Sequence, residues 1–138
     1  MNRPLHSPLR WLACLLLIAT AATHIPLIPE HLKEAPYIGI LFVALSATSL
    51  VLAVLVVLAD TPAIWLVTGA MTLLAVVAFL ASRTVGLPMI GDDIGNWTEP
   101  LGIPALTAET LAFLAAVAVL RHGPASHRHS HATQKGTS

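Results

Sequence analysis

Four long stretches of apolar residues dominate this chain, with polar residues at only a few positions inside them. They cover residues 11–28, 37–59, 63–81 and 104–120. A helix needs about 20 mostly apolar residues to cross the hydrocarbon core of a bilayer, and each stretch is close to that length. Because lipid offers the backbone no hydrogen-bond partners, and because the stretches lack the alternation of barrel strands, they predict helices. The predicted fold is an all-α bundle of four transmembrane helices.

The composition agrees with a fold whose solvent is lipid. Hydrophobic residues make up 56% of the 138 residues, and charged residues make up 10%, against roughly 25% in a typical soluble domain. The formal net charge of zero argues against a polybasic surface, so we expect the lipid bilayer and no nucleic acid as partner. The four spans leave room only for short connections, so a functional site must lie in the bundle or its loops.

The chain divides into an N-terminal segment (1–10), a membrane domain (11–121) and a polar tail (122–138) that we expect to be disordered. The first apolar stretch also resembles a signal peptide, because Arg10 precedes it and Ala19-Thr20-Ala21 has the pattern of a cleavage site. The apolar residues continue to Ile28, beyond the usual length of such a segment, which favours a retained helix. Cleavage would leave three spans.

Positive charges predict the orientation, because Lys and Arg collect on the cytoplasmic side. Five of the seven Lys and Arg residues lie before the first span or after the fourth, namely Arg3, Arg10, Arg121, Arg128 and Lys135. Both termini are therefore predicted to be cytoplasmic, in a protein of the plasma membrane. Trp11 and Trp65 are then expected near the inner boundary, and Tyr37 and Trp97 near the outer one.

The connections between the spans differ in length. Asp60-Thr61-Pro62 is a tight inner turn, in which Asp60 or Thr61 is expected to cap the third span and Pro62 to occupy its first turn. The outer connection, residues 82–102, is about twenty residues long, and loops of this length are usually functional or mobile. We therefore expect a site on the outer side.

Glu109 is the most costly residue of the chain, since an unpaired acid near the bilayer centre costs about 2.5–3.5 kcal/mol. It shares a helix face with small residues, Ala105, Ala112 and Ala116, which predicts that it points into the bundle. Arg83 is the preferred partner, because a guanidinium stays charged and grips a carboxylate with two hydrogen bonds. The second candidate is His24.

A second group of ionisable residues lies around the first outer turn, where His24, Glu30 and His31 occur among two prolines. Imidazole and carboxylate suit zinc, copper or iron, but His24 and His31 lack a known metal-ligand spacing. A hydrogen-bonded loop or a short interfacial helix is the alternative. The tail carries His127, His129 and His131, which can also bind metal ions, although a flexible tail needs no function.

Small and hydroxylated residues follow one face of each of the two middle spans. The positions are Gly39, Ser46, Ser49 and Ala53 in the second span, and Thr68, Thr72, Ala75 and Ser82 in the third. Such residues allow helices to approach closely and to form modest interhelical hydrogen bonds. We interpret both faces as packing surfaces rather than as the lining of a pore.

Two short strings carry a resemblance to other proteins. Pro29-Glu30-His31, followed later by Ser82-Arg83-Thr84-Val85-Gly86-Leu87-Pro88 and by Glu99 and Glu109, resembles a group of small four-helix membrane proteins common in actinobacteria. The resemblance covers most of residues 11–120. It implies the four-span topology, and it implies no named activity, cofactor or catalytic residue.

Three functional hypotheses follow from these residues. In the first, an outer-facing cluster binds a small ligand, an ion or a partner; its members are His24, Glu30, His31, Arg83, Glu99 and Glu109. In the second, the protein is a structural or accessory subunit, in which Arg83 pairs with Glu109 or Glu99 and the bundle recruits another subunit or a second copy. A metal-dependent membrane enzyme comes third, because no nucleophile motif, phosphate loop or dinucleotide fingerprint occurs.

Overall fold

The computed structural model describes residues 3–122, and within them the chain forms five α-helices and two short 3-10 helices. In chain order they are α1 (Arg10–His24), η1 (Ile25–Leu27), α2 (Ile28–Glu34), α3 (Pro36–Leu58), α4 (Pro62–Thr84), η2 (Gly91–Asp93) and α5 (Gly102–His122). Proline occupies the first or second position of α2, α3 and α4, where its missing N–H removes no helical hydrogen bond.

Four helical stretches are long and apolar enough to cross a membrane. They are Arg10–Glu34, which combines α1, η1 and α2, then Pro36–Leu58, Pro62–Thr84 and Gly102–His122. The predicted all-α bundle of four spanning helices is confirmed, and it fits a multi-pass membrane protein. The predicted outer turn after His24 is not a loop, because helical geometry continues through η1 into α2. Of the two alternatives for that turn, the structure has the short helix.

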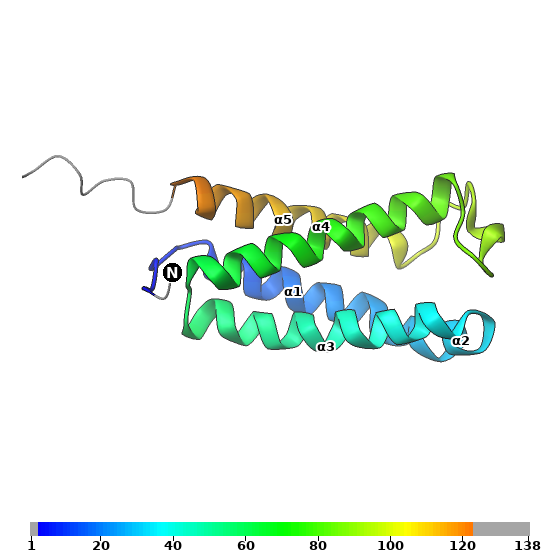
Figure 1. Cartoon of the computed structure of the whole chain (residues 1–138), viewed down its shortest axis with the longest axis horizontal. Helices are drawn as coiled ribbons and strands as arrows, with labels where there is room; N and C mark the ends of the chain where they lie inside the picture. Colours follow the sequence, from blue (N-terminus) through cyan, green and yellow to red (C-terminus); the bar gives the residue numbers. More distant parts are fainter. Residues whose placement is uncertain (1–2, 123–138) are drawn as a thin grey trace, which may run out of the picture.

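The four long helices lie side by side along one axis, as Figure 1 shows. α1 packs against α3 and α5, and α4 packs against α5, whereas α3 and α4 contact each other only sparsely. Residue 3 and the end of α5 lie at the same end of the bundle, which we call the terminal end. The opposite end holds α2 and residues 85–101, and we call it the loop end.

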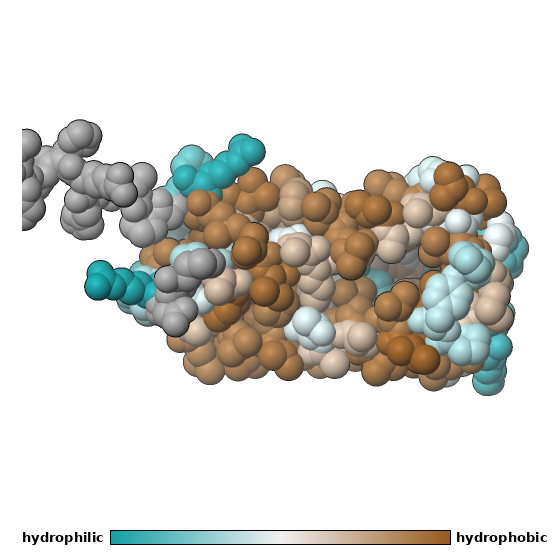
Figure 2. Space-filling view, in the orientation of Figure 1, coloured by the Kyte–Doolittle hydropathy of each residue, from teal (hydrophilic) through white to brown (hydrophobic). Residues whose placement is uncertain are grey.

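The sides of the bundle are apolar. Figure 2 shows hydrophobic residues over most of the visible face between the two ends. Large side chains such as Leu58 (77% exposed) and Leu15 (66% exposed) point outward. In water such a surface would drive association, so lipid is the environment that this exposure fits.

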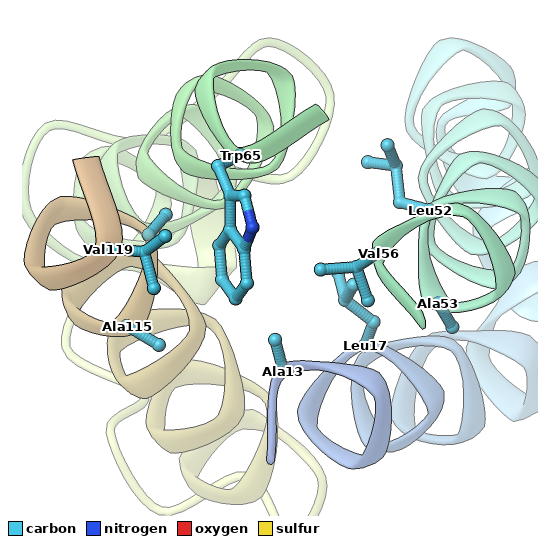
Figure 3. Close-up of a cluster of buried hydrophobic side chains, with 9 residues drawn as sticks. Ala13, Leu17, Leu52, Ala53, Val56, Trp65, Ala115 and Val119 are labelled. Atoms are coloured by element: carbon cyan, nitrogen blue, oxygen red, sulfur yellow. The ribbon is translucent and has the colours of Figure 1, made fainter. Parts of the chain in front are cut away.

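Trp65 fills the centre of the bundle in its terminal half. Its indole is fully buried and projects from α4 between Val119 of α5 and Val56 of α3, with Ala13 of α1 beneath (Figure 3). Trp65 lies in the first turn of α4, at the predicted end of the bundle, but its ring packs inside the bundle rather than on its surface. The ring is a core residue, because the small side chains around it, such as Ala13, leave a space that only a large residue fills.

Asp60 fastens the N-terminal segment to the bundle. It is buried and has a left-handed backbone (φ 45°). Its carboxylate accepts hydrogen bonds from the Ser7 N–H and from the Trp65 indole N–H, both at 2.6 Å, and its carbonyl accepts one from the Leu5 N–H at 2.8 Å. Thr61 is the N-cap residue of α4, but its side chain makes no capping hydrogen bond. The predicted N-cap position of Thr61 and the place of Pro62 in the first turn are thus confirmed without a side-chain capping bond, and Asp60 connects other elements instead.

α2 crosses α3 at Gly39, where the two backbones come very close. A Cβ atom at Gly39 would lie 2.6 Å from Leu32 Cγ and 2.7 Å from the Leu32 backbone nitrogen. Real Cβ atoms do not make such contacts with backbone, so this position requires glycine. The crossing keeps α2, with His31, close to α3 at the loop end.

The two predicted packing faces are largely buried. On α3, Gly39, Ser46, Ser49 and Ala53 are buried, and on α4 so are Thr68, Thr72 and Ser82. Ala75 is only half-buried. It belongs to the site described next.

Candidate functional site

A cavity of about 480 Å³ opens between α3 and α4 in the half of the bundle nearest the loop end. Its walls come from α3 and α4, and its floor includes His24 of α1 and Glu109 of α5. Figure 2 shows the hollow on the visible face near the loop end, with hydrophilic colour inside it. The cavity therefore combines apolar walls with a few polar groups in its depth.

The sizes of the facing side chains explain where the cavity lies. In the terminal half, Trp65 occupies the space between the helices. In the loop-end half, several of the side chains that line the cavity are small, namely Ala75 and Ala78 on α4 and Ala105 on α5. Because α3 and α4 contact each other sparsely, these alanines leave the space unfilled.

The mouth of the cavity faces sideways, toward the surroundings of the bundle. Leu41 on α3 and Leu74 on α4 both line it, and they are 56% and 69% exposed. In a bundle that spans a bilayer, such exposed leucines on the helix sides contact acyl chains. The mouth of the cavity is thus bordered by apolar side chains.

Glu109 points into the bundle, as predicted, and is 2% exposed. It lies seven residues after the start of α5, about 10 Å along the helix axis. Its Oε1 atom has no hydrogen-bond partner among residues 3–122. His24 Nε2 lies 3.6 Å from this oxygen, beyond the roughly 3.2 Å limit of an ordinary hydrogen bond. Buried polar groups without partners are uncommon, and this one lies in the cavity wall.

The two histidines of the cavity are held in the same way. His24 Nδ1 lies 2.9 Å from the Thr20 carbonyl, and His31 Nδ1 lies 2.9 Å from the Leu27 carbonyl. A carbonyl can only accept, so Nδ1 carries the hydrogen, and Nε2 of each neutral ring keeps a free lone pair. The Phe42 ring lies 4.8 Å from both imidazole centroids. His24 and His31 thus flank one aromatic wall of the cavity.

Arg83 closes the cavity at the loop end, where it is 4% exposed. Its Nη1 lies 2.8 Å from an Asp93 oxygen, at ion-pair distance but without hydrogen-bond alignment, and its Nη2 is paired with Glu99. Its carbonyl accepts a hydrogen bond from the Gly95 N–H at 2.9 Å. Residues 85–101 therefore fold back onto the last turn of α4.

These contacts correct the predicted partner of Glu109. Arg83 does not pair with Glu109, because the acids of the long connection, Asp93 and Glu99, already surround its guanidinium. The alternative pair, Arg83 with Glu99, is present. His24, the second candidate, is the group that faces Glu109.

The ionisable groups of the cavity carry an excess of acid. Three carboxyl groups line it, those of Asp93, Glu99 and Glu109, against the single guanidinium of Arg83. Two of the carboxyl groups contact Arg83, so its charge is already balanced. The third, that of Glu109, has no cation beside it.

The structure brings together five of the six predicted site residues. His24, His31, Arg83, Glu99 and Glu109 all line the cavity, whereas Glu30 is exposed on α2 and does not. Sequence reasoning missed Asp93 and Phe42. The sequence does contain a signal for Asp93, since it is an acid in the connection after Arg83 and can fold back to the guanidinium. It contains no signal for Phe42, because a single aromatic ring in a long apolar stretch looks like any lipid-facing residue.

Tyr37 also has a role beyond the predicted one. Besides its predicted place near the outer boundary, which stays a prediction, the Tyr37 hydroxyl donates a hydrogen bond to the Pro88 carbonyl at 2.6 Å. It thereby joins the start of α3 to the connection after α4. The ring lines the cavity beside Ile38.

Within residues 3–122, no three His, Cys, Asp or Glu side chains come close enough to share a metal ion. His24 and His31 each contribute one nitrogen to the cavity, but no third such ligand joins them. The tail histidines, His127, His129 and His131, lie outside the described residues.

Comparison with protein families, curated proteins and solved structures finds no match for this chain. The resemblance to small actinobacterial membrane proteins therefore stays a prediction. The cavity and its side chains are the basis for a functional assignment.

Proposed function

We propose that this multi-pass membrane protein binds a small amphipathic molecule in the cavity between α3 and α4. The observation that carries the proposal is the buried, unpartnered carboxyl group of Glu109 in the wall of that cavity. The volume of about 480 Å³ falls within the roughly 300–1,000 Å³ of small-molecule sites. Such sites typically combine apolar walls with a few converging polar groups, as this cavity does.

The route into the cavity favours a molecule that dissolves in the membrane. Its apolar part passes between Leu41 and Leu74, which line the mouth. Its polar group then reaches Glu109 and His24 in the depth of the cavity. Following the distribution of Lys and Arg, we place the loop end outside the cell and the protein in the plasma membrane.

A second candidate function is that of a structural or accessory subunit. The contacts of Arg83 with Asp93 and Glu99 favour it, because they fix the long connection to α4 without a ligand. A partner subunit or a second copy would then bind elsewhere on the bundle. This candidate leaves the Glu109 carboxyl group unexplained, which is why we prefer ligand binding.

A cavity-filling substitution tests the proposal. Ala75→Phe places a large ring in the cavity, whereas Ala70→Phe places the same ring on an exposed part of α4 outside it. Three similar probes should be offered to the detergent-purified proteins: tetraphenylphosphonium, tetraphenylborate and neutral triphenylphosphine oxide. Native mass spectrometry then reports how many probe molecules remain bound to each protein.

We expect at least one probe to bind the wild-type protein and Ala70→Phe with one molecule per chain. Ala75→Phe should lose that binding, because the added ring occupies the cavity. If no probe binds, or if Ala75→Phe binds as well as Ala70→Phe, the cavity is not the site.

A further inference from the structure

We infer that the ligand of this cavity is a lipophilic cation: a protonated or quaternary amine, or a related onium ion, whose substituents are apolar. The inference rests on the proposed function and adds the charge of the ligand. It comes from three features of the site, namely the balance of charges, the aromatic walls and the orientation of the histidines.

One guanidinium against three carboxyl groups leaves the cavity with an excess of two acids. Asp93 and Glu99 both contact Arg83 and form one group with it at the loop end of the cavity, although the Nε and Nη1 atoms of Arg83 make no hydrogen bond. Glu109 lies apart from that group, with an oxygen that no donor reaches. An entering cation supplies the missing opposite charge, and the low polarity of the walls strengthens the attraction. An anion would instead meet three carboxyl groups.

The walls suit a cation that carries little water. Phe42, Tyr37 and Phe79 line the cavity, and the faces of aromatic rings attract cations. Phe79 already shows this contact, because the Arg83 guanidinium carbon lies 5.0 Å from its ring centroid. A bare metal ion, by contrast, would find no group of three His, Cys, Asp or Glu ligands among residues 3–122.

The histidines add acceptors rather than donors. Because Nδ1 of His24 and of His31 is bound to a backbone carbonyl, Nε2 of each neutral ring presents a lone pair. A lone pair attracts a cation and accepts an N–H from a protonated amine. Glu109 and His24 therefore form one acceptor pair, 3.6 Å apart, for the charged group of the ligand.

The charge of the probe tests this inference. Isothermal titration calorimetry in a non-ionic detergent measures the affinity for each of the three probes, tetraphenylphosphonium, triphenylphosphine oxide and tetraphenylborate. The proteins compared are the wild type, Glu109→Gln and Glu30→Gln. Gln keeps the shape of Glu and removes its charge. Glu30→Gln is the matched control, because Glu30 is exposed and does not line the cavity.

We expect the wild-type protein to prefer tetraphenylphosphonium over the other two probes. Glu109→Gln should raise the Kd for the cation by about tenfold or more, because one partner of a buried charge pair is lost, and should leave the neutral probe unaffected. Glu30→Gln should change neither. Circular dichroism and the unfolding midpoint establish that Glu109→Gln is folded.

Two outcomes overturn the inference and separate it from the proposed function. If the wild-type protein binds the neutral or the anionic probe as tightly as the cation, the cavity binds ligands but does not select cations. If Glu109→Gln is folded and keeps the wild-type preference, Glu109 does not provide the selection. If no probe binds, both the inference and the proposed function fail. The comparison of the three probes on the wild-type protein tests the inference even if Glu109→Gln does not fold.

Discussion

At the scale of single residues, two buried carboxyl groups have opposite environments. Asp60 accepts hydrogen bonds at both of its oxygens, from Ser7 and Trp65, and so contributes to the stability of the folded chain. Glu109 is buried to a similar extent, but one of its oxygens has no partner. A satisfied buried acid strengthens a fold, and an unsatisfied one weakens it. This difference is why we assign structure to Asp60 and binding to Glu109.

The role of Asp60 can be tested by removing its carboxylate. Asp60→Ala leaves two buried N–H groups without acceptors, and each such group costs about 1–3 kcal/mol. We therefore expect the free energy of unfolding to fall by about 2 kcal/mol or more. Tryptophan fluorescence during thermal unfolding in detergent measures the change, because Trp65 is one of the two lost partners.

Two further variants control that experiment. Asp60→Asn keeps an acceptor oxygen and tolerates the left-handed backbone, so it should lose less stability than Asp60→Ala. Asp92→Ala removes an exposed acid and should leave the midpoint unchanged. Equal midpoints for Asp60→Ala and Asp92→Ala would show that Asp60 does not fasten the N-terminal segment.

At the scale of helices, the loop end depends on two contacts between neighbouring elements. α2 crosses α3 at Gly39, and the 85–101 connection is held to α4 through Arg83. Between these contacts α3 and α4 stay apart, and the cavity lies in the space that they leave. The shape of the site thus depends on how α2 and the connection are fixed.

Gly39→Val should displace α2 from α3, because the new side chain would overlap the Leu32 backbone. We expect a lower unfolding midpoint and faster cleavage by trypsin after Lys33, which is exposed on α2. Gly91→Ala is the matched control, since a Cβ atom there meets no atom within 4 Å. Equal cleavage rates in the two variants would mean that α2 is not held by this crossing.

The helices themselves could be predicted, whereas their contacts could only partly be predicted. The length of the apolar stretches determines the spans, and the small residues around Glu109 correctly predict that it faces inward. Helical periodicity gives the face of a residue but not the rotation of one helix against another. For this reason Arg83 was predicted to pair with Glu109, whereas the long connection folds back and brings Asp93 and Glu99 to it. The cavity also escaped prediction, because it depends on several alanines on different helices.

At the scale of the complete bundle, the two halves differ in how their interior is packed. The terminal half is filled around Trp65 and holds the helices together (Figure 3). The loop-end half is open between α3 and α4 and holds the buried ionisable residues His24, Arg83 and Glu109. A stable half beside an open half is the arrangement that a binding protein needs, because the site is held in place without being filled by its own side chains.

The most direct test of the account is to locate a bound cation. A crystal of the protein grown with a bromophenyl derivative of triphenylphosphonium would give an anomalous signal from the bromine atom. We expect a bromine peak between α3 and α4, with the phosphonium group beside Glu109 and His24. A peak only on the outer surface of the bundle, with the cavity filled by other atoms, would contradict it.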